Sequence, residues 1–289
     1  MNTIYAVMDA LLPFEFMQFT FMKNALLAIL LLTPLLGLMG TMAVNQKMAF
    51  FSDALGHSAL TGIGLGMLLG VQSDLVSMLI FGIVWALMIS RLKQRGSASV
   101  DTVISVFSST SVALGLVILS QGGGFARYST LLVGDVLAVT PSDLLWLLLA
   151  LIITVFAWVM LYNPLLMTSV NPALARSRGM NTKLCEYGFV VLVALAVMLA
   201  IRWVGVMLIN ALLIVPAAAG RNLARSSRSH AMWSVLIALT SGIGGLIAAF
   251  YLNTSAGAAI VLAASLWYAL SLGVRWMRER PGRKGLSHE

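Results

Sequence analysis

The feature that most constrains this chain is a succession of long apolar runs separated by short polar segments. A helix of about 20 apolar residues is long enough to cross the hydrocarbon core of a bilayer. Soluble domains carry charges on about 25% of their residues, whereas only 10% of these 289 residues are charged and 60% are hydrophobic. The sequence therefore predicts an all-α, polytopic integral membrane protein with a single transmembrane domain over residues 1–289. It excludes a soluble enzyme.

The apolar runs lie at residues 17–44, 49–71, 74–91, 101–120, 142–161, 184–201, 203–220, 231–251 and 256–276. They predict about eight to nine transmembrane helices. Two segments are less regular. We expect an interfacial helix within the first 15 residues. The glycines at 122–124 should break a helix, so residues 121–141 are expected to form a short external or re-entrant helix.

Lys and Arg cluster in alternate connections between the runs. They follow the first, third, fifth and seventh runs and recur in the C-terminal tail. The positive-inside rule places such segments in the cytoplasm, which is consistent only with an N-terminus outside and a C-terminus in the cytoplasm. Because topology accounts for the net charge of +8, we expect no nucleic-acid partner.

The run at 49–71 carries a polar stripe made of Asp53, His57 and Thr61. Residues four apart share one face of a helix. An ionisable group inside a membrane segment is costly and usually marks a pathway or a site, and a carboxylate with an imidazole suits Mn²⁺, Fe²⁺ or Zn²⁺. The alternative is that Asp53 and His57 only pair with each other or cap a helix.

A stripe of small residues lies beside the polar stripe: Ala54, Ser58, Gly62, Gly66 and Gly70. Small residues at this spacing let membrane helices approach closely. We therefore expect this helix to pack centrally, with its carboxylate and imidazole facing inward.

Other polar groups inside the runs are weaker candidates for a translocation path. Asp101 and Ser105 give the fourth run a polar face, although hydroxyl groups there could instead bond backbone carbonyls of their own helix. Asn210 and Pro216 interrupt the seventh run and predict a kink.

The polar segment at about 163–183 predicts a short helix. Asn171 suits the N-cap, Pro172 suits the first helical position and Gly179 suits the end. Together with Arg176 they would form a cytoplasmic helix that docks on a partner. An ordinary connecting helix is the alternative.

Motifs for enzymatic chemistry are missing. The chain has no G-x-x-x-x-G-K-[ST] phosphate-binding loop, so it should have no ATPase site of its own, and no H-E-x-x-H zinc-protease motif. Two hypotheses from other classes stay open at this point: an intramembrane enzyme that pairs Asp53 with Asp101, and a membrane scaffold without transport activity.

These segments resemble the zinc/manganese/iron-type permeases of ATP-binding-cassette (ABC) importers over nearly the whole chain. The most specific match is the Asp-x-x-x-His segment of Asp53 and His57. Asn171 stands where the family often has Asp, and Asn210 stands where a small residue is frequent. The other matching segments are residues 132–138, 171–179, 204–218 and 255–260.

The resemblance implies an ABC importer permease fold in the bacterial cytoplasmic membrane and a path for divalent manganese, zinc or iron. It implies that Asp53 and His57 contact the passing ion, with no permanently bound cofactor. It also implies a second permease copy, identical or paralogous, two cytoplasmic ABC ATPase subunits that hydrolyse ATP, and an extracytoplasmic metal-binding receptor. A permease for a metal chelate, such as a siderophore, is the alternative within the same class.

Overall fold

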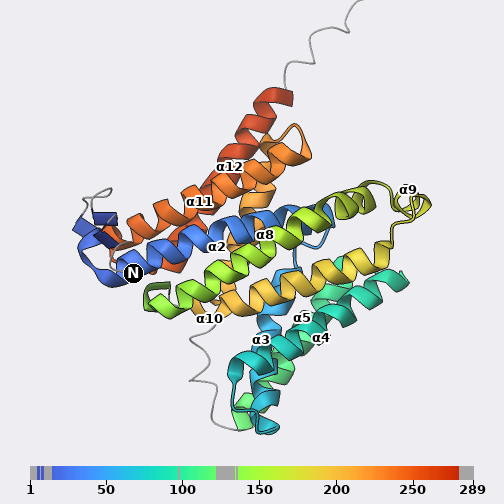
Figure 1. Cartoon of the computed structure of the whole chain (residues 1–289), viewed down its shortest axis with the longest axis horizontal. Coiled ribbons are helices and arrows are strands. Elements are labelled where there is room, and N and C mark those ends of the chain that lie inside the picture. The colour runs from blue at the N-terminus through green and yellow to red at the C-terminus, as the bar shows by residue number, and fades with distance from the viewer. Residues whose placement is uncertain are drawn as a thin grey trace, which may run out of the picture.

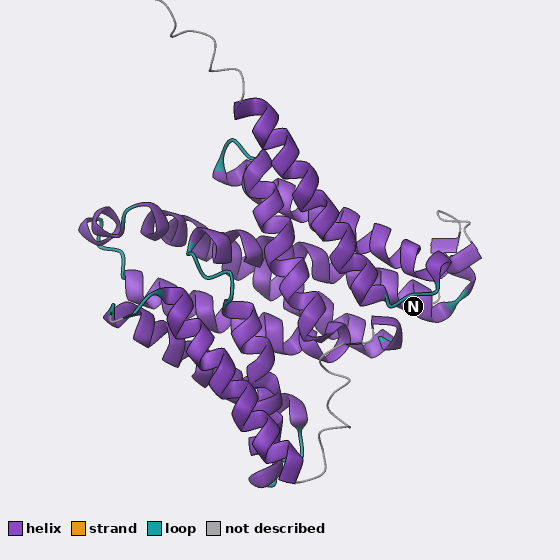
Figure 2. Ribbon diagram, turned by 180° about the vertical axis from the view of Figure 1, so that it is seen from behind, coloured by secondary structure: helices purple, strands orange, loops and turns teal. Residues whose placement is uncertain are grey.

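The computed structural model describes residues 5–6, 8–9, 15–96, 98–121, 134 and 136–279, and it leaves the side chains of residues 202 and 203 undescribed. All regular secondary structure in these residues is helical (Figures 1 and 2). The long helices are α2 (Thr20–Asn45), α3 (Phe51–Leu68), α4 (Asp74–Arg95), α5 (Val100–Gln121), α8 (Pro141–Val170), α10 (Thr182–Leu223), α11 (Ser227–Leu252) and α12 (Ala256–Glu279). The short elements are η1 (Glu15–Gln18), η2 (Val136–Ala138) and α9 (Pro172–Ser177).

Eight helical segments in the described residues are long and apolar enough to cross a membrane, with α10 contributing two of them, Thr182–Ile201 and Val204–Leu223. Helix α3 is not among the eight, although it corresponds to the predicted run at 49–71. Asp53, His57 and several small residues lower its hydropathy. With α3 as a ninth bundle helix, the predicted count of eight to nine is confirmed.

The two apolar halves of helix α10 meet at a break in the regular helical backbone. Gly205 has φ 76° and ψ 162°, a conformation that glycine adopts without the steric cost of a Cβ. The backbone dihedral angles stay helical at Asn210 and Pro216, and the kink predicted at these two residues stays a prediction. A proline is tolerated in a membrane helix when neighbours satisfy the freed backbone groups. The break lies about one and a half turns before Asn210.

The helices differ strongly in how far the rest of the chain covers them. The apolar stretches of α2 and of the second half of α10 are each 67% buried, whereas those of α8 and α12 are 17% buried. Helix α3 packs against α4, α5 and α10. The bundle thus has a centre formed by α2, α3 and α10, and α8 and α12 expose most of their surface.

The predicted close packing of the small-residue stripe on α3 is confirmed against α4. A Cβ added at Gly62 would lie 3.0 Å from the Cβ of Phe81, and one added at Gly66 would lie 2.5 Å from the Cβ of Ser77. Both distances are shorter than ordinary van der Waals contact. Only glycine lets the two helices approach this closely.

The two irregular segments are described in part. Residues 122–133 and 135 lie outside the described residues, so the expected external or re-entrant helix stays a prediction there. The amide nitrogen of Asn24 donates to the Val139 carbonyl at 3.1 Å, which ties the chain after η2 to α2. In the N-terminal segment, Lys23 of α2 forms an ion pair with Asp9 at 2.6 Å. An interfacial position of the first 15 residues stays a prediction.

Candidate functional site

Helix α3 is buried along almost its whole length except at one narrow line. Between residues 51 and 66 only Asp53, His57 and Leu65 are not buried. These positions are separated by multiples of four residues, so they lie on the same face of the helix. Two of the three residues of the predicted polar stripe, Asp53 and His57, therefore lie on the side of α3 that the rest of the chain leaves open.

The carboxylate and the imidazole lie within reach of each other on this open line. The Nε2 atom of His57 is 3.5 Å from Oδ1 of Asp53, and the side chains are 31% and 43% exposed. Asp53 is in the first turn of α3, but the N-cap residue is Phe50 and no side chain caps that end. Asp53 therefore does not cap the start of α3, but it does pair with His57.

Asn210 reaches the same carboxylate from the second half of α10. Its Nδ2 donates a hydrogen bond of 2.7 Å to Oδ1 of Asp53. The approach is made possible by Gly56, because a Cβ there would overlap the side chain of Val206. Asp53, His57 and Asn210 therefore form one cluster at the contact of α3 with α10. Sequence analysis named all three residues, but nothing in the sequence indicated that Asn210 touches Asp53.

Thr61 lies on the polar line by spacing, but it is turned into the bundle. It is fully buried, and its hydroxyl donates to the backbone carbonyl of Ser111 on α5. The glycine contacts Thr61–Gly115 and Gly64–Ile118 show that α3 and α5 run in the same direction. Lining of the path by Thr61 stays a prediction.

The polar face predicted on α5 is present and open. Asp101 and Ser105 are exposed, as is Ser109 one turn further on. Because α5 runs alongside α3, this face starts near the end of the bundle where α3 begins. The structure does not bring Asp101 or Ser105 into hydrogen-bond contact with Asp53 or His57 among the described interactions, and their place in the path stays a prediction.

The predicted short helix after α8 is confirmed in its local geometry. The side chain of Asn171 accepts hydrogen bonds from the backbone N–H groups of Ala173 and Leu174, at 3.1 and 3.0 Å. Pro172 is the first helical residue, and Gly179 ends the segment with φ +76°. Arg176 is exposed, and its Nε donates to the Pro172 carbonyl of its own turn. Helix α9 projects from the end of the bundle (Figure 1).

A polar cavity of about 420 Å³ lies beside α9 and is lined by groups from α2, α4, α8 and α10. Lys93 at the end of α4 and Glu186 at the start of α10 pair across it at 2.9 Å, and both side chains are about 15% exposed (15% and 14%). Gln94 and Ser90 also donate to Glu186, each at 3.4 Å. Sequence analysis missed this ion pair. The signal was present as a carboxylate just inside the apolar run at 184–201.

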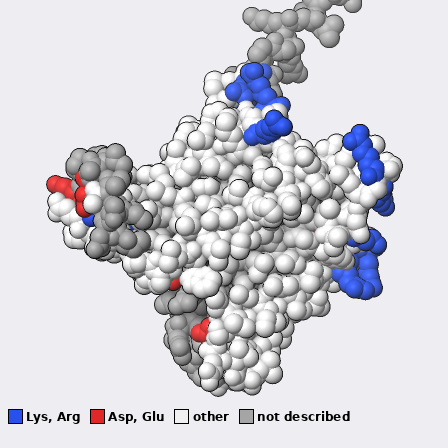
Figure 3. All heavy atoms as spheres, in the orientation of Figure 1, with Lys and Arg blue, Asp and Glu red and all other residues white. Residues whose placement is uncertain are grey.

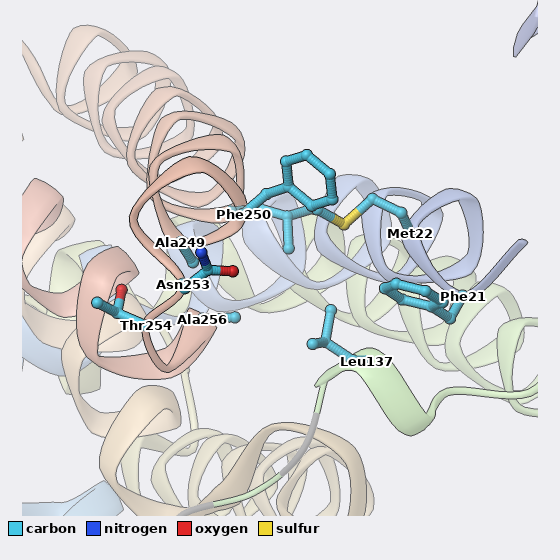
Figure 4. Close-up of a pocket in the computed structure, with 9 residues that line it drawn as sticks. Phe21, Met22, Leu137, Ala249, Phe250, Asn253, Thr254 and Ala256 are labelled. Atoms are coloured by element: carbon cyan, nitrogen blue, oxygen red, sulfur yellow. The ribbon is translucent and has the colours of Figure 1, made fainter. Parts of the chain in front are cut away.

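A second cavity, of about 310 Å³, lies at the opposite end of α2. Figure 4 shows Phe21 and Met22 of α2 on one side, Asn253 and Thr254 of the α11–α12 turn on the other, and Leu137 of η2 between them. None of the described residues that line it is charged, so they offer no carboxylate or imidazole to a cation.

On the face in Figure 3 most charged groups lie at the ends of the molecule, and two small acidic patches lie below its middle. Lys and Arg gather around α9 and at the end of α12, while the broad middle of the face carries none. A wide band without charge is what the hydrocarbon core of a bilayer requires. Within the described residues, no group of three or more His, Cys, Asp or Glu side chains is placed to hold a metal ion. The Asp53–His57 pair alone is therefore an incomplete ligand set.

The helical bundle and its apolar band identify the chain as a multi-pass membrane protein. Two solved structures share its fold. The chain superposes on a chain of PsaBC from Streptococcus pneumoniae in complex with Fab with a TM-score of 0.76, 28% identity and coverage of 94% of this chain and 95% of that one. An inward-facing metal-chelate type ABC transporter shares the fold at a TM-score of 0.66 and 14% identity.

The sequence profile of the ABC 3 transport family matches residues 18–275, and the chain belongs to this family. A zinc uptake membrane protein, ZnuB of Haemophilus influenzae, is 32% identical over 91% of this chain and 100% of its own length. The manganese import permease ScaB of Streptococcus parasanguinis is 31% identical over 93% of this chain and 96% of its own length. The chain is thus the permease subunit of an ABC importer and not an ATPase. This confirms the predicted fold and class and removes the enzyme and scaffold hypotheses.

Proposed function

We propose that the permease carries Zn²⁺ or Mn²⁺ across the bacterial cytoplasmic membrane and that Asp53 and His57 contact the ion in transit. The observation that carries the proposal is the open line on α3. Between residues 51 and 66 these two polar groups and Leu65 are the only side chains that are not buried. The two relatives by sequence described above are zinc and manganese systems, which favours these ions over iron and over a bulky chelate.

The pair can replace part of the hydration shell of either ion. A carboxylate oxygen and an imidazole nitrogen suit manganese and zinc alike. Partial exposure of both side chains leaves them reachable from a path, and a small number of ligands favours release as well as binding. The ion is cargo, so no permanently bound cofactor is proposed.

A second permease copy would cover the open line. Ionisable groups left against lipid are costly, and Asp53 is 43% exposed in the single chain. The exposed polar face of α5, with Asp101 and Ser105, needs the same cover. A twofold arrangement would bring two such faces together around one path. Homodimer and paralogous heterodimer both satisfy this argument.

Helix α9 is proposed as the contact with a cytoplasmic ABC ATPase subunit. It is short, capped at both ends and exposed, so it can transmit a push to α8 and α10, which it connects. The basic groups around it favour a cytoplasmic position (Figure 3). The N-terminus would then lie outside, and an extracytoplasmic metal-binding receptor would deliver the ion at the end of the bundle opposite α9.

The test is uptake of radioactive Zn²⁺ and Mn²⁺ by cells that lack their own importers and express the permease with its ATPase and receptor. Asp53→Ala and His57→Ala should each lower uptake by at least about tenfold, since loss of even an outer partner at a metal site costs about 10–100-fold. Asp74→Ala, at an exposed carboxylate in the first turn of α4, is the matched control.

Two results would contradict the proposal. Normal uptake by Asp53→Ala and His57→Ala variants that insert normally would remove the ion site. Uptake that is inhibited by metal chelates but not by free ions would replace the ion with a chelate as substrate.

A further inference from the structure

Asn210 places its amide beside the candidate ion ligands in an arrangement that leaves one hydrogen-bonding atom unused. The Nδ2 atom donates to Asp53 at 2.7 Å. The Oδ1 atom is buried and has no hydrogen-bond partner. Buried polar atoms in proteins are nearly always paired, so an unpaired one calls for an explanation.

The same oxygen of Asp53 faces two nitrogen atoms. Oδ1 accepts from Asn210 at 2.7 Å, and it lies 3.5 Å from Nε2 of His57. A cation bound between Asp53 and His57 would need the lone pairs that these nitrogens now face. The amide N–H group of Asn210 therefore sits on the Asp53 carboxylate where a cation would bind.

A half-turn of the amide about its Cβ–Cγ bond exchanges nitrogen and oxygen without moving the backbone. It would bring the unused oxygen next to Oδ1 of Asp53, an unfavourable contact of two acceptors unless a cation lies between them. With a cation present, the carboxylate oxygen, the amide oxygen and the His57 imidazole would share it.

Resting on the proposed function, we infer that Asn210 is the third ion ligand and a determinant of ion selectivity. In the empty site its amide N–H holds the Asp53 carboxylate. In the loaded site its amide oxygen binds the ion. The described residues offer no third His, Cys, Asp or Glu to complete the pair, and Asn210 fills that gap with a neutral oxygen. Carbonyl and carboxylate oxygens suit Mn²⁺, whereas imidazole suits Zn²⁺, so the third ligand should favour Mn²⁺.

The experiment measures equilibrium binding of Mn²⁺ and of Zn²⁺ to the full-length permease, purified with its co-purifying subunits. Asn210→Leu, similar in size but without polar atoms, should weaken Mn²⁺ binding by at least about tenfold and Zn²⁺ binding by clearly less. Asn210→Asp keeps an oxygen at this position and should retain or tighten Mn²⁺ binding, which separates ligation from folding.

Asn222→Leu is the matched control. Asn222 lies on the same half of α10 and also forms an inter-helix hydrogen bond, to Ser271 of α12 at 3.0 Å, three turns away from Asn210. This variant should bind both ions as the unaltered protein does. A loss at Asn222 equal to that at Asn210 would overturn the inference.

Other outcomes separate the two proposals. Equal weakening of both ions by Asn210→Leu, or no weakening, overturns the role of Asn210 while leaving the site intact, provided that Asp53→Ala abolishes binding. If Asp53→Ala binds both ions normally, the proposed site itself fails, and the role of Asn210 fails with it.

Discussion

Helices α3 and α8 belong to the same bundle but have opposite surfaces. Helix α8 has the highest hydropathy of the candidate spans, yet only 17% of its apolar stretch is buried. Helix α3 is too polar to count as a span, yet most of its residues are buried. Lipid is as apolar as leucine, so apolar side chains gain nothing by facing inward, whereas small and polar groups are best placed against protein. Of these two helices, the more apolar one is therefore the more exposed, and the more polar one is the more buried.

The largest expected effect, on membrane insertion, comes from placing a carboxylate on the exposed surface of α8. Ile152 of α8 is 58% exposed, so Ile152→Asp would face lipid. Asp near the centre of a membrane helix disfavours insertion by about 2.5–3.5 kcal/mol. We expect little membrane-inserted, folded protein, measured by membrane fractionation and size-exclusion chromatography.

Asp53→Leu on α3 is the companion variant. It removes a native charge, so insertion should stay normal while ion uptake falls. If Ile152→Asp inserts as well as the unaltered protein, the assignment of α8 to the lipid-facing surface is wrong.

A smaller effect, on thermal stability, is expected when leucine replaces a closely packed glycine rather than an exposed one. Gly66 on α3 touches Ser77 of α4, whereas a Cβ at Gly273 on α12 would meet nothing within 4 Å. Overpacking a filled site costs about 1–3 kcal/mol, so Gly66→Leu should lower thermal stability in detergent. Gly273→Leu should leave it unchanged or raise it, because leucine is the better helix former. Equal melting temperatures for the two variants would mean that α3 and α4 are not closely packed.

The smallest effect on stability is expected where α8 ends and α9 begins. Asn171→Ala removes an N-cap with two hydrogen bonds, a loss of about 1 kcal/mol. Gly179→Ala forces a side chain into φ +76°, at about 1–2 kcal/mol. Overall folding should survive both changes.

Transport should suffer more than folding in these two variants. We expect ATP hydrolysis by the complex to continue with less ion moved per ATP, and Arg176→Ala should show the same loss of coupling. Unchanged ratios of transport to hydrolysis would remove α9 from the coupling role. Ser169→Ala, which removes only a hydrogen bond within α8, is the control.

Much of the fold could be predicted from the chain because its signals are local. The apolar runs located the spanning helices, and residues 171–179 specified a capped short helix through Asn171, Pro172 and Gly179. The break at Gly205 was not predicted, because no local pattern distinguishes that glycine from the many others in the chain. The Lys93–Glu186 pair was missed because its members are far apart in sequence.

The sequence by itself determined which helices form, which of them is polar and which residue types could meet an ion. Periodicity and hydropathy need only neighbours along the chain, so these conclusions required no tertiary information. Only the tertiary structure decided that the line of Asp53 and His57 stays open, that Thr61 turns into the bundle and that Asn210 reaches Asp53. Those facts depend on how close α3, α5 and α10 lie, and glycine packing between distant segments sets those distances.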